Sequence, residues 1–403
     1  MKICIWMTKL FELGGTKRVV TLLSNELVKK HDVTIMIHQD PLTEDRSMYH
    51  MSKDIKVDFI KLSDFVDKRK TPAFVFRFVI KKLNKTLGMF NRSCFDQFLA
   101  DAYFPGKTRE RWINYLNRQD YDIIIATAAL SLELAVLAPG LKAKTIGWQH
   151  SCFDGYLYKP NALFRNQESL LKRYLPGLDR YIVLSEYDKR DYKEKLGIST
   201  EVRTNPRSFV SKKKCDPSRK RFLMVGRLAY VKGLDLLLDS FGEFCREDSE
   251  WQLDIVGDGE LGDELRALAA EKGLTDRVNF AGYTNEPEKY YLNSSVFLLP
   301  SRWEGWPMAV MEAYEFGLPV IAYRTAAMDL IVEDGVTGYL AEAFDTHGFA
   351  AAMKRMASDR ELRYRMHCNV IEKSEDFAIE KTVKEWEQLF DKVVNGGEKC
   401  PVS

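Results

Sequence analysis

The segment Phe222-Leu-Met-Val-Gly226-Arg227-Leu-Ala-Tyr-Val-Lys232-Gly233 decides the fold expected for this chain. It has the pattern of a short buried strand, a glycine turn with two cations, and the start of a helix. The helix that follows has apolar residues at i, i+3, i+4 and i+7, namely Leu234, Leu237, Leu238 and Phe241. A helix of this kind covers one face of a sheet, so the segment predicts one strand-helix unit of a parallel sheet.

The same alternation of strand and helix patterns extends in both directions from this segment. Strands are expected at Lys2–Met7, Asp32–Ile37, Tyr121–Ala126, Lys144–Trp148, Phe222–Val225, Trp251–Val256, Val278–Ala281, Val296–Leu299 and Val320–Tyr323. Helices are expected at Thr16–Lys30, Gly233–Arg246, Gly259–Lys272, Pro307–Phe316 and Ile379–Val394. The rhythm stops and restarts once, which predicts two α/β domains, each with a parallel sheet.

A polar, basic stretch at residues 203–220, with Pro206 and Pro217, is the best candidate for the connection between the domains. We therefore place one domain at residues 1–205, a second at 206–378 and a final helical segment at 379–403. The length of 403 residues fits two large domains.

Composition excludes several classes of protein. Hydrophobic residues make up 45%, and the net charge is only +2, so the chain is neither disordered nor a nucleic-acid binder by bulk charge. The charge is unevenly distributed. Residues 1–210 carry 35 Lys and Arg against 24 Asp and Glu, a net charge of +11, and the remaining 25 against 34 give −9. The basic half is expected to lie near anions.

Seven scattered cysteines without a paired spacing are typical of a reducing cytoplasm, and the first apolar run is too short for a signal peptide. No transmembrane helix is expected. The segment 66–92 combines eight Lys and Arg with several phenylalanines. Two interpretations stay open: an element lying on an anionic membrane surface, or an ordinary helix that buries its apolar side and exposes solvated lysines.

The strongest chemical motif is Arg302-Trp-Glu304-Gly-Trp-Pro307-Met-Ala-Val-Met-Glu312, directly after an apolar strand. Ligands of open α/β sheets bind at the carboxyl ends of the strands, so the motif has the right position. With Pro307 as the first helical residue, the N–H groups of Met308, Ala309 and Val310 are expected to form an anion site. The two carboxylates are expected to accept hydrogen bonds from polyol hydroxyls, and Arg227 and Lys232 can neutralise a diphosphate without a metal.

Two other motifs are weaker. Gly257-Asp-Gly259-Glu-Leu-Gly262 has the formal spacing of a dinucleotide-binding turn, but the next strand ends at Ala281-Gly282-Tyr283 without the acid that holds a ribose. Asp120-Tyr-Asp122 resembles a metal-binding pair, but it precedes its strand and lies at the wrong edge of the sheet. We interpret it as a turn, and no metal site is expected.

In the first half, Gly14-Gly15-Thr16 is a tight turn into a helix that permits close approach of a ligand to the backbone. His150 lies at the end of the strand Lys144–Trp148, where it can line a ligand site. A lone histidine is also often structural.

Together these motifs resemble the retaining GT-B glycosyltransferases of family 4, whose hallmark is two glutamates separated by seven residues, here Glu304 and Glu312. The resemblance spans nearly the whole chain. It covers Gly14-Gly15, His150, Ser185, Asn205-Pro206, Gly226-Arg227, Lys232-Gly233, the Val256–Gly259 turn, Phe280–Tyr283 and the two-glutamate motif.

The resemblance implies two Rossmann-like domains facing each other across a cleft, with the acceptor bound by the first and the donor by the second. It implies a catalytic set of Glu304, His150, Arg227 and Lys232. It also implies that the donor is held by Gly14, Gly15, Arg227, Lys232, Gly282, Tyr283, Glu304, Gly305, Trp306, Pro307, Met308, Ala309 and Glu312. The final helix packs back on the first domain. Two departures from the family are Lys17, where an acid is frequent, and the bulky Trp306, which is expected to restrict the donor sugar.

The sequence thus predicts a retaining, metal-independent glycosyltransferase. The expected donor is a nucleotide-diphosphate sugar, with UDP favoured and a hexose or N-acetylhexosamine transferred. The expected acceptor is a glycan or lipid-linked glycan of surface polysaccharide or glycoconjugate synthesis. We expect a cytoplasmic protein that contacts the inner face of the membrane if segment 66–92 binds it. A nucleotide-sugar epimerase of the same fold and a non-catalytic glycan- or nucleotide-binding subunit remain alternatives.

Overall fold

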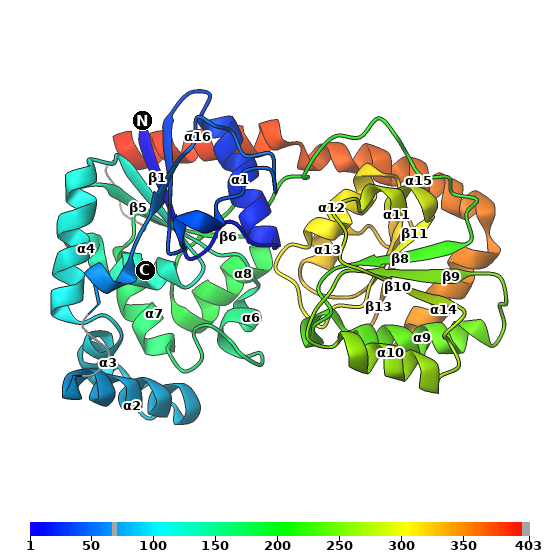
Figure 1. Cartoon of the computed structure of the whole chain (residues 1–403), viewed down its shortest axis with the longest axis horizontal. Coiled ribbons are helices and arrows are strands. Elements are labelled where there is room, and N and C mark those ends of the chain that lie inside the picture. The colour runs from blue at the N-terminus through cyan, green and yellow to red at the C-terminus, as the bar shows by residue number, and fades with distance from the viewer. Residues whose placement is uncertain (67–70, 397–403) are drawn as a thin grey trace. The chain divides into compact units, whose positions relative to one another are not determined.

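The computed structural model describes residues 1–66 and 71–396, and the chain divides into two compact units. The first unit is Met1–Asn205 together with the segment that begins at Ile379, and the second is Pro206–Ala378. Each unit contains one parallel sheet and helices (Figure 1). The predicted α/β fold with two parallel-sheet domains is confirmed.

The sheet of the first unit has seven strands in the order β3-β2-β1-β4-β5-β6-β7. Their bounds are β1 (Lys2–Met7), β2 (Asp32–Ile37), β3 (Lys56–Phe59), β4 (Ile123–Thr127), β5 (Lys144–Trp148), β6 (Arg180–Val183) and β7 (Glu201–Val202). All neighbouring pairs are parallel. The central strands are buried on both faces, as a sheet covered by helices on both sides requires.

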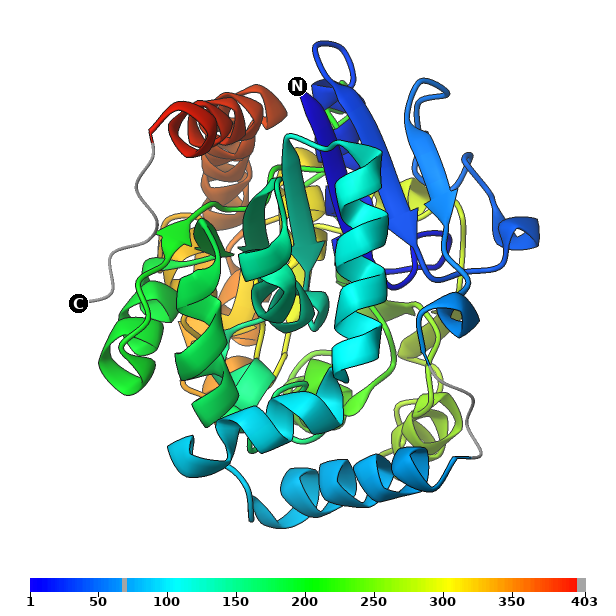
Figure 2. The ribbon, with the colours of Figure 1, turned by 90° about the vertical axis from the view of Figure 1, so that its left-hand side faces the viewer.

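The helices of the first unit vary in length from one turn to more than four. Their bounds are α1 (Gly15–Leu27), α2 (Pro72–Leu87), α3 (Asp96–Tyr103), α4 (Gly106–Gln119), α5 (Leu130–Leu137), α6 (Phe153–Leu157), α7 (Glu168–Tyr174), α8 (Glu186–Asp191) and α16 (Ile379–Asn395). The views of Figures 1 and 2 agree that α2 lies at the periphery of this unit, next to α3.

The last helix, α16, belongs to the first unit although the second unit precedes it in sequence. The indole ring of Trp386 packs 4.7 Å from that of Trp148 on β5, and the Trp386 side chain is fully buried. Lys30, which follows α1, forms an ion pair with Glu387 at 2.9 Å. These contacts attach α16 to both a strand and a helix of the first unit.

The sheet of the second unit has six parallel strands in the order β10-β9-β8-β11-β12-β13. The strands are β8 (Arg221–Val225), β9 (Gln252–Val256), β10 (Val278–Gly282), β11 (Val296–Leu299), β12 (Val320–Tyr323) and β13 (Gly338–Ala341). The helices are α9 (Leu234–Cys245), α10 (Gly262–Glu271), α11 (Glu288–Asn293), α12 (Met308–Glu315), α13 (Met328–Ile331), α14 (Thr346–Ser358) and α15 (Arg360–Ser374).

The strand order reverses at β8, which lies between β9 and β11. Such a reversal leaves a crevice at the carboxyl ends of the two strands, because the connections from them leave in opposite directions. The loops that follow β8 and β11 therefore meet at the position where a ligand is expected. Both carry residues that the sequence singled out.

Two expected features differ from the structure. The helix expected from Gly259 begins at Gly262, because the Leu261 N–H is hydrogen-bonded to the Leu228 carbonyl at 3.1 Å. The connection 203–220 is not a loose linker over its whole length. Arg207 and Cys215 are buried, and the Cys215 N–H donates to the Phe316 carbonyl at 2.8 Å.

Candidate active site

The loops after β8, β9 and β10 form a hydrogen-bonded layer at the carboxyl edge of the second sheet. The Gly226 N–H donates to the Val256 carbonyl, and the Gly257 N–H donates to the Gly282 carbonyl, both at 2.9 Å. A Cβ atom at Gly257 would lie 2.0 Å from the Gly226 carbonyl oxygen, and this glycine has a φ of 139°. A Cβ atom at Gly259 would likewise lie 2.4 Å from the Leu228 carbonyl oxygen, so Gly257 and Gly259 of the formal dinucleotide motif are explained by close packing between two turns.

Lys232 and Glu304 meet at this edge from two different loops. The Lys232 Nζ lies 2.6 Å from Oε1 of Glu304, and the Ser301 hydroxyl donates to the same oxygen at 2.6 Å. The approach of the loops requires Gly233, which has a φ of 62° and whose Cβ, if present, would lie 2.1 Å from the Pro300 carbonyl oxygen. Among the described residues, Oε2 of Glu304 has no hydrogen-bond partner.

Arg302 fixes the relative position of the same two loops. Its guanidinium donates to both carboxylate oxygens of Asp235 on α9, at 2.9 and 2.5 Å, and to the Tyr230 carbonyl at 2.7 Å. Burial alone raises the pKa of Asp235, but the hydrogen bond and charge of Arg302 outweigh burial, and the net pKa is lowered. The bidentate pair holds the loop that carries Lys232 against the loop that carries Glu304.

Arg227 differs from Lys232 in its surroundings. Its side chain is exposed, and it has no hydrogen bond or ion pair within residues 1–66 and 71–396. Arg227 is thus a cation available to a ligand in the loop after β8, the same loop that carries the paired Lys232.

The start of α12 differs from the prediction at two residues. Pro307 is the residue before the helix, with extended dihedral angles, rather than its first helical residue. The Val310 N–H is not available to an anion, because it donates to the Pro307 carbonyl at 3.1 Å. The N–H groups of Met308 and Ala309 make no such bond in the described structure and keep the expected orientation at the helix start.

Trp306 is buried, with an exposure of 7%, and its ring meets Phe377 edge-on at a centroid distance of 6.0 Å. Its indole Nε1 has no hydrogen-bond partner among the described residues although the atom is buried. Gly305, next to it, is also buried. Trp306 therefore forms part of the wall behind the loop that carries Glu304.

Glu312 lies in a different environment from Glu304. It is buried on α12, with an exposure of 5%, and the Tyr291 hydroxyl donates to its Oε2 at 3.0 Å. The Ser208 hydroxyl donates to its Oε1 at 3.3 Å. The two glutamates of the motif thus have separate sets of partners.

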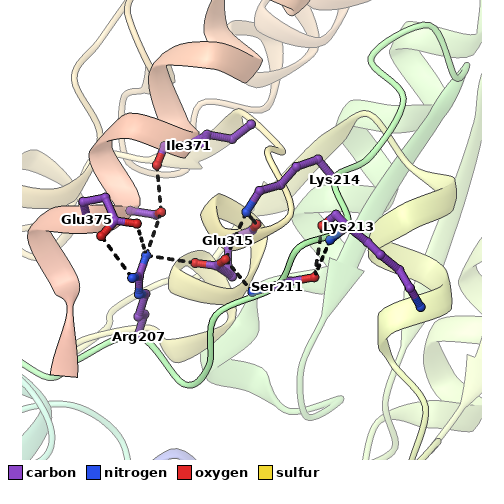
Figure 3. A network of polar contacts seen from close by, with 8 residues as sticks. Arg207, Ser211, Lys213, Lys214, Glu315, Ile371 and Glu375 are labelled. Atoms are coloured by element: carbon purple, nitrogen blue, oxygen red, sulfur yellow. Dashed lines mark hydrogen bonds and ion pairs between the residues drawn. The ribbon is translucent and has the colours of Figure 1, made fainter.

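The opposite end of α12 is anchored by a network of charges around the buried Glu315 (Figure 3). The Arg207 guanidinium donates to Glu315 at 3.1 Å and to the two oxygens of Glu375 at 2.8 and 3.1 Å. Lys214 pairs with Glu315 at 3.0 Å, and the Ser211 N–H donates to it at 2.7 Å. The Glu315 side chain is 2% exposed, so the network fixes the helix between the segments that enter and leave the second unit.

Gly282 and Tyr283 end β10 beside this layer of loops. Gly282 has a φ of 71°, a conformation that favours glycine, and nothing lies within 4 Å of the position of its absent Cβ. The Tyr283 ring is half exposed, and its hydroxyl donates to Asn285. An exposed ring at the end of β10 is available to stack on a planar ligand.

In the first unit, Gly14 and Gly15 lie at the start of α1, as expected. Both are exposed, and the Gly14 N–H donates to the Tyr49 hydroxyl at 2.9 Å. The Lys17 Nζ lies 3.4 Å from the position that a Cβ of Gly14 would occupy. The side chain of Lys17 thus lies over the turn, where it adds a positive charge to the start of the helix.

His150 follows β5 and packs against the ring of Trp148, with a centroid distance of 4.3 Å. Neither ring nitrogen has a hydrogen-bond partner among the described residues, although both are buried. Burial lowers the pKa of His150 to about 3. The imidazole is therefore neutral at physiological pH.

Asp120 and Asp122 form a turn at the amino edge of the first sheet. Asp120 ends α4 with a left-handed φ of 56°, and Asp122 accepts the Lys2 N–H at 2.7 Å. In the described part of the chain, no three His, Cys, Asp or Glu side chains are grouped as a metal site requires. The predicted turn is confirmed.

Several residues of the site were not predicted from the sequence. Ser301, Tyr291, Ser208 and Arg207 each hold a glutamate of α12 or of the loop before it. Only the contact of Ser301 could have been predicted from the sequence. A hydroxyl residue shortly after a strand and three residues before Glu304 is near enough to donate a hydrogen bond to its carboxylate. The others come from distant segments that only the fold brings to α12.

The geometry above can be compared with known proteins. Residues 207–373 match the family described as "Glycosyl transferases group 1", and residues 13–208 match "Glycosyltransferase Family 4". An uncharacterized glycosyltransferase of Haemophilus influenzae is 32% identical over 66% of this chain and 75% of that protein. The chain belongs to the family 4 glycosyltransferases.

Two further relatives of this glycosyltransferase are larger or more distant. The amylovoran biosynthesis glycosyltransferase AmsD of Erwinia amylovora is 26% identical over 68% of this chain and 78% of that protein. The exopolysaccharide phosphotransferase SCO2592 of Streptomyces coelicolor is 26% identical over 98% of this chain, which spans only 41% of that protein's length.

Solved structures confirm the GT-B fold of this glycosyltransferase. A mutant of S. aureus TarM, in complex with Fondaparinux, alpha-GlcNAc-glycerol and UDP, has a TM-score of 0.77 at 16% identity. The comparison covers 97% of this chain and 100% of that chain. Anabaena Alr3699/HepE, in complex with UDP and glucose, has a TM-score of 0.73 at 16% identity with the same coverage.

Proposed function

We propose that this glycosyltransferase transfers a hexose or N-acetylhexosamine from a UDP-sugar to a glycan or lipid-linked glycan, with retention of configuration and without a metal. The observation that carries the proposal is the pair of Lys232 and Glu304 beside the exposed Arg227, at the carboxyl edge of the second sheet. Two cations and one oriented carboxylate are the groups that a sugar diphosphate needs.

In this proposal the donor diphosphate is bound by Arg227 and by the two ammonium protons of Lys232 that Glu304 does not accept. The N–H groups of Met308 and Ala309 bind an oxygen of the same diphosphate. Oε2 of Glu304 accepts a hydrogen bond from a sugar hydroxyl, since Oε1 is occupied by Lys232 and Ser301. These cations supply the charge that a divalent ion supplies in other transferases.

The other donor contacts are assigned in the same way. Glu312 accepts a hydrogen bond from the ribose, and Tyr283 stacks on the base. The assignment of UDP is supported by the UDP in the two solved structures of similar fold. The role of His150 and of Gly14 and Gly15 in donor binding stays a prediction.

The proposed reaction breaks the bond between the anomeric carbon and the phosphate oxygen, and the bonding electrons remain on the phosphate. An oxygen of the acceptor attacks the same face of the sugar, and its proton passes to the departing phosphate. Arg227 and Lys232 stabilise the negative charge that develops on the diphosphate. No side chain is assigned as a covalent nucleophile.

A role in the assembly of surface polysaccharide is supported by the names of relatives such as the amylovoran biosynthesis glycosyltransferase AmsD. Residues 1–210 carry a net charge of +11, which suits an acceptor held on an anionic membrane, so we propose that the enzyme works at the cytoplasmic face of the membrane. Within residues 1–66 and 71–396 there is no helix with the length and apolar character needed to cross a bilayer.

The first test is thermal unfolding of the full chain with UDP, GDP, ADP and dTDP in excess, each with and without EDTA. A ligand at about 100 times its dissociation constant stabilises the folded state by about 2.7 kcal/mol, enough to raise the midpoint by a few degrees. The proposal predicts a shift with UDP that persists in EDTA. A shift that EDTA removes would contradict metal independence, and a shift with another nucleotide alone would contradict the donor.

A second measurement tests retention and separates transfer from epimerisation. Proton NMR of the product of a UDP-sugar with a matching acceptor gives the configuration of the new anomeric bond. Inversion would contradict the proposed mechanism. Formation of an epimer in the absence of acceptor would favour the epimerase instead.

A further inference from the structure

The helix α2 exposes apolar side chains of the kind that a helix of a water-soluble protein normally buries. Val75, Phe76, Phe78 and Val79 are 55%, 58%, 57% and 45% exposed, and they form the outer side of its first two turns. The interpretation of segment 66–92 as a helix with a buried apolar side holds for Ile80 but is wrong for these four residues. Of that segment, residues 67–70 lie outside the described residues.

The inner side of α2 is held to the first unit by Ile80, which is 6% exposed and belongs to the hydrophobic core, and by polar groups. Asn84 is fully buried, its side-chain amide donates to the Asn166 carbonyl at 2.6 Å, and its Oδ1 accepts the Phe90 N–H at 3.0 Å. The Lys81 Nζ lies 5.1 Å from the centre of the Tyr103 ring. Because Ile80, Asn84 and Lys81 occupy the inner side of the helix, Val75, Phe76, Phe78 and Val79 face outward as part of the fold.

The exposed apolar side chains continue onto the next helix. The Phe76 ring meets the Phe98 ring of α3 at a centroid distance of 6.4 Å, and Phe98 meets Phe90 at 5.4 Å. Figure 2 shows α2 along the lower edge of the first unit, with one side away from the rest of that unit. A contiguous exposed apolar patch of this kind marks an interaction surface.

The charges on α2 identify the kind of partner. Lys82 and Lys85 are exposed on the last two turns and have no acidic partner among the described residues, and α2 contains no Asp or Glu. Arg92, shortly after the helix, is exposed as well. A second copy of the chain placed on this surface would bring like charges together, whereas an anionic surface complements them.

We propose that α2 binds to an anionic lipid bilayer. The surface is defined by Val75, Phe76, Phe78, Val79, Lys82 and Lys85, and it is called the α2 surface below. The apolar side chains of its first half enter the boundary between headgroups and acyl chains, and the cations of its second half contact lipid phosphates. The inference deepens the proposed function. It rests on that function in one respect only, namely that the acceptor is carried by the same membrane.

The test is sedimentation of the full chain with vesicles, in the absence of donor and acceptor. Vesicles of phosphatidylcholine with about 30% phosphatidylglycerol are expected to carry the protein into the pellet at low salt. Vesicles of phosphatidylcholine alone are expected to bind the protein at least about tenfold more weakly, since the electrostatic attraction between the cations of α2 and the lipid is lost. A protein that stays in the supernatant with the anionic vesicles at low salt would overturn the proposal.

Variants locate the binding surface. Phe76→Ser with Phe78→Ser, and separately Lys82→Gln with Lys85→Gln, are each expected to weaken binding by about tenfold or more. The control is Tyr364→Ser on α15 of the second unit, where an aromatic residue is 61% exposed, and it is expected to bind like the wild type. Equal binding by the phenylalanine variant and the wild type would overturn the assignment to α2.

A third readout reports insertion directly. In Phe78→Trp, the emission of the added tryptophan is compared with that of the wild type, and a shift to shorter wavelength with quenching by brominated lipid is expected. An emission spectrum that the vesicles do not change would overturn the proposed insertion of α2. If the wild-type chain does not bind anionic vesicles but is stabilised by UDP, the α2 surface is rejected and the transferase proposal stands. If the wild-type chain binds the vesicles but no nucleotide stabilises it, the donor assignment alone is rejected.

Discussion

Oε1 of Glu304 is shared between Lys232 and Ser301, each at 2.6 Å, while Oε2 has no partner among the described residues. The carboxylate is therefore held in one orientation by the protein itself, with one oxygen fixed and one able to accept a further hydrogen bond. Orientation before binding is the usual source of catalytic advantage, because the groups need not reorganise during the reaction.

Lys232→Ala is predicted to lower kcat by about 10²–10³. The reason is that the lysine holds Glu304 and, in the proposed function, neutralises the diphosphate. The measurement is initial rate of UDP release at saturating donor and acceptor. The matched control is Lys373→Ala, which removes a lysine of similar exposure that pairs with Glu333 at 2.8 Å and lies on α15. A control as inactive as Lys232→Ala would mean that the loss reflects the fold and not the site.

Tyr291→Phe is predicted to raise the KM for the donor about tenfold with a smaller effect on kcat. The hydroxyl donates to Oε2 of Glu312 at 3.0 Å, and a hydrogen bond to a charged group contributes about 1.5–3 kcal/mol. Without it, the carboxylate is no longer held in the orientation in which the proposed function has it bind the ribose.

Tyr314→Phe is the matched control for this prediction. Tyr314 is also buried on the second unit, and its hydroxyl donates to Thr337 at 3.0 Å. Each variant removes one buried hydroxyl donor, so both are expected to lower the thermal midpoint. Only Tyr291→Phe is expected to change the donor KM, and equal KM values would reject the role of Tyr291 in positioning Glu312.

Arg207→Met is predicted to destabilise the second unit by about 3 kcal/mol, because it leaves the buried Glu315 with less positive charge. Glu375→Ala is the contrast, since the Glu375 side chain is 65% exposed and its pairing with Arg207 is expected to contribute less than about 1 kcal/mol. Urea unfolding measures both. If Glu375→Ala lowered the free energy of unfolding as much as Arg207→Met, the exposed part of the network, and not the buried pair, would be what stabilises the fold.

The fold and the ligand edge of the second sheet could be predicted from the sequence because each rests on local patterns. Strand β8, with Phe222 and Leu223, is part of a continuous apolar run, and the helix after Gly233 has a clear apolar face. Lys232 and Glu304 could be placed at one edge because parallel strands end at the same side.

The partners of these residues could not be predicted in the same way. Arg207 reaches Glu315 across 108 residues of sequence, and Ser208 reaches Glu312 across 104. No local pattern encodes such contacts. Helix α12 begins one residue later than predicted, because Pro307 adopts extended dihedral angles and its carbonyl accepts the Val310 N–H. Helix ends depend on such individual bonds more than on periodicity.

His150→Phe is predicted to make the protein less sensitive to acid. Burial lowers the pKa of His150 from its usual 6.5 to about 3, so the unfolded state takes up a proton as the pH falls below about 6.5 while the folded state does not. The stability lost by this route grows by about 1.4 kcal/mol for each pH unit below that value. At pH 5, the phenylalanine variant is therefore expected to gain about 2 kcal/mol relative to the wild type, compared with their difference at pH 8.

The measurement is urea unfolding of both proteins between pH 8 and pH 5. His38, whose pKa burial lowers to about 4, acts in the same direction, and Glu133, whose pKa burial raises to about 7, acts in the opposite direction. Both groups are present in the two proteins, so they cancel in the difference. A difference that does not change with pH would show that His150 is protonated normally in the folded protein. The imidazole would then carry charge near pH 6, and its proposed contact with a donor sugar would have to be that of a cation rather than a neutral ring.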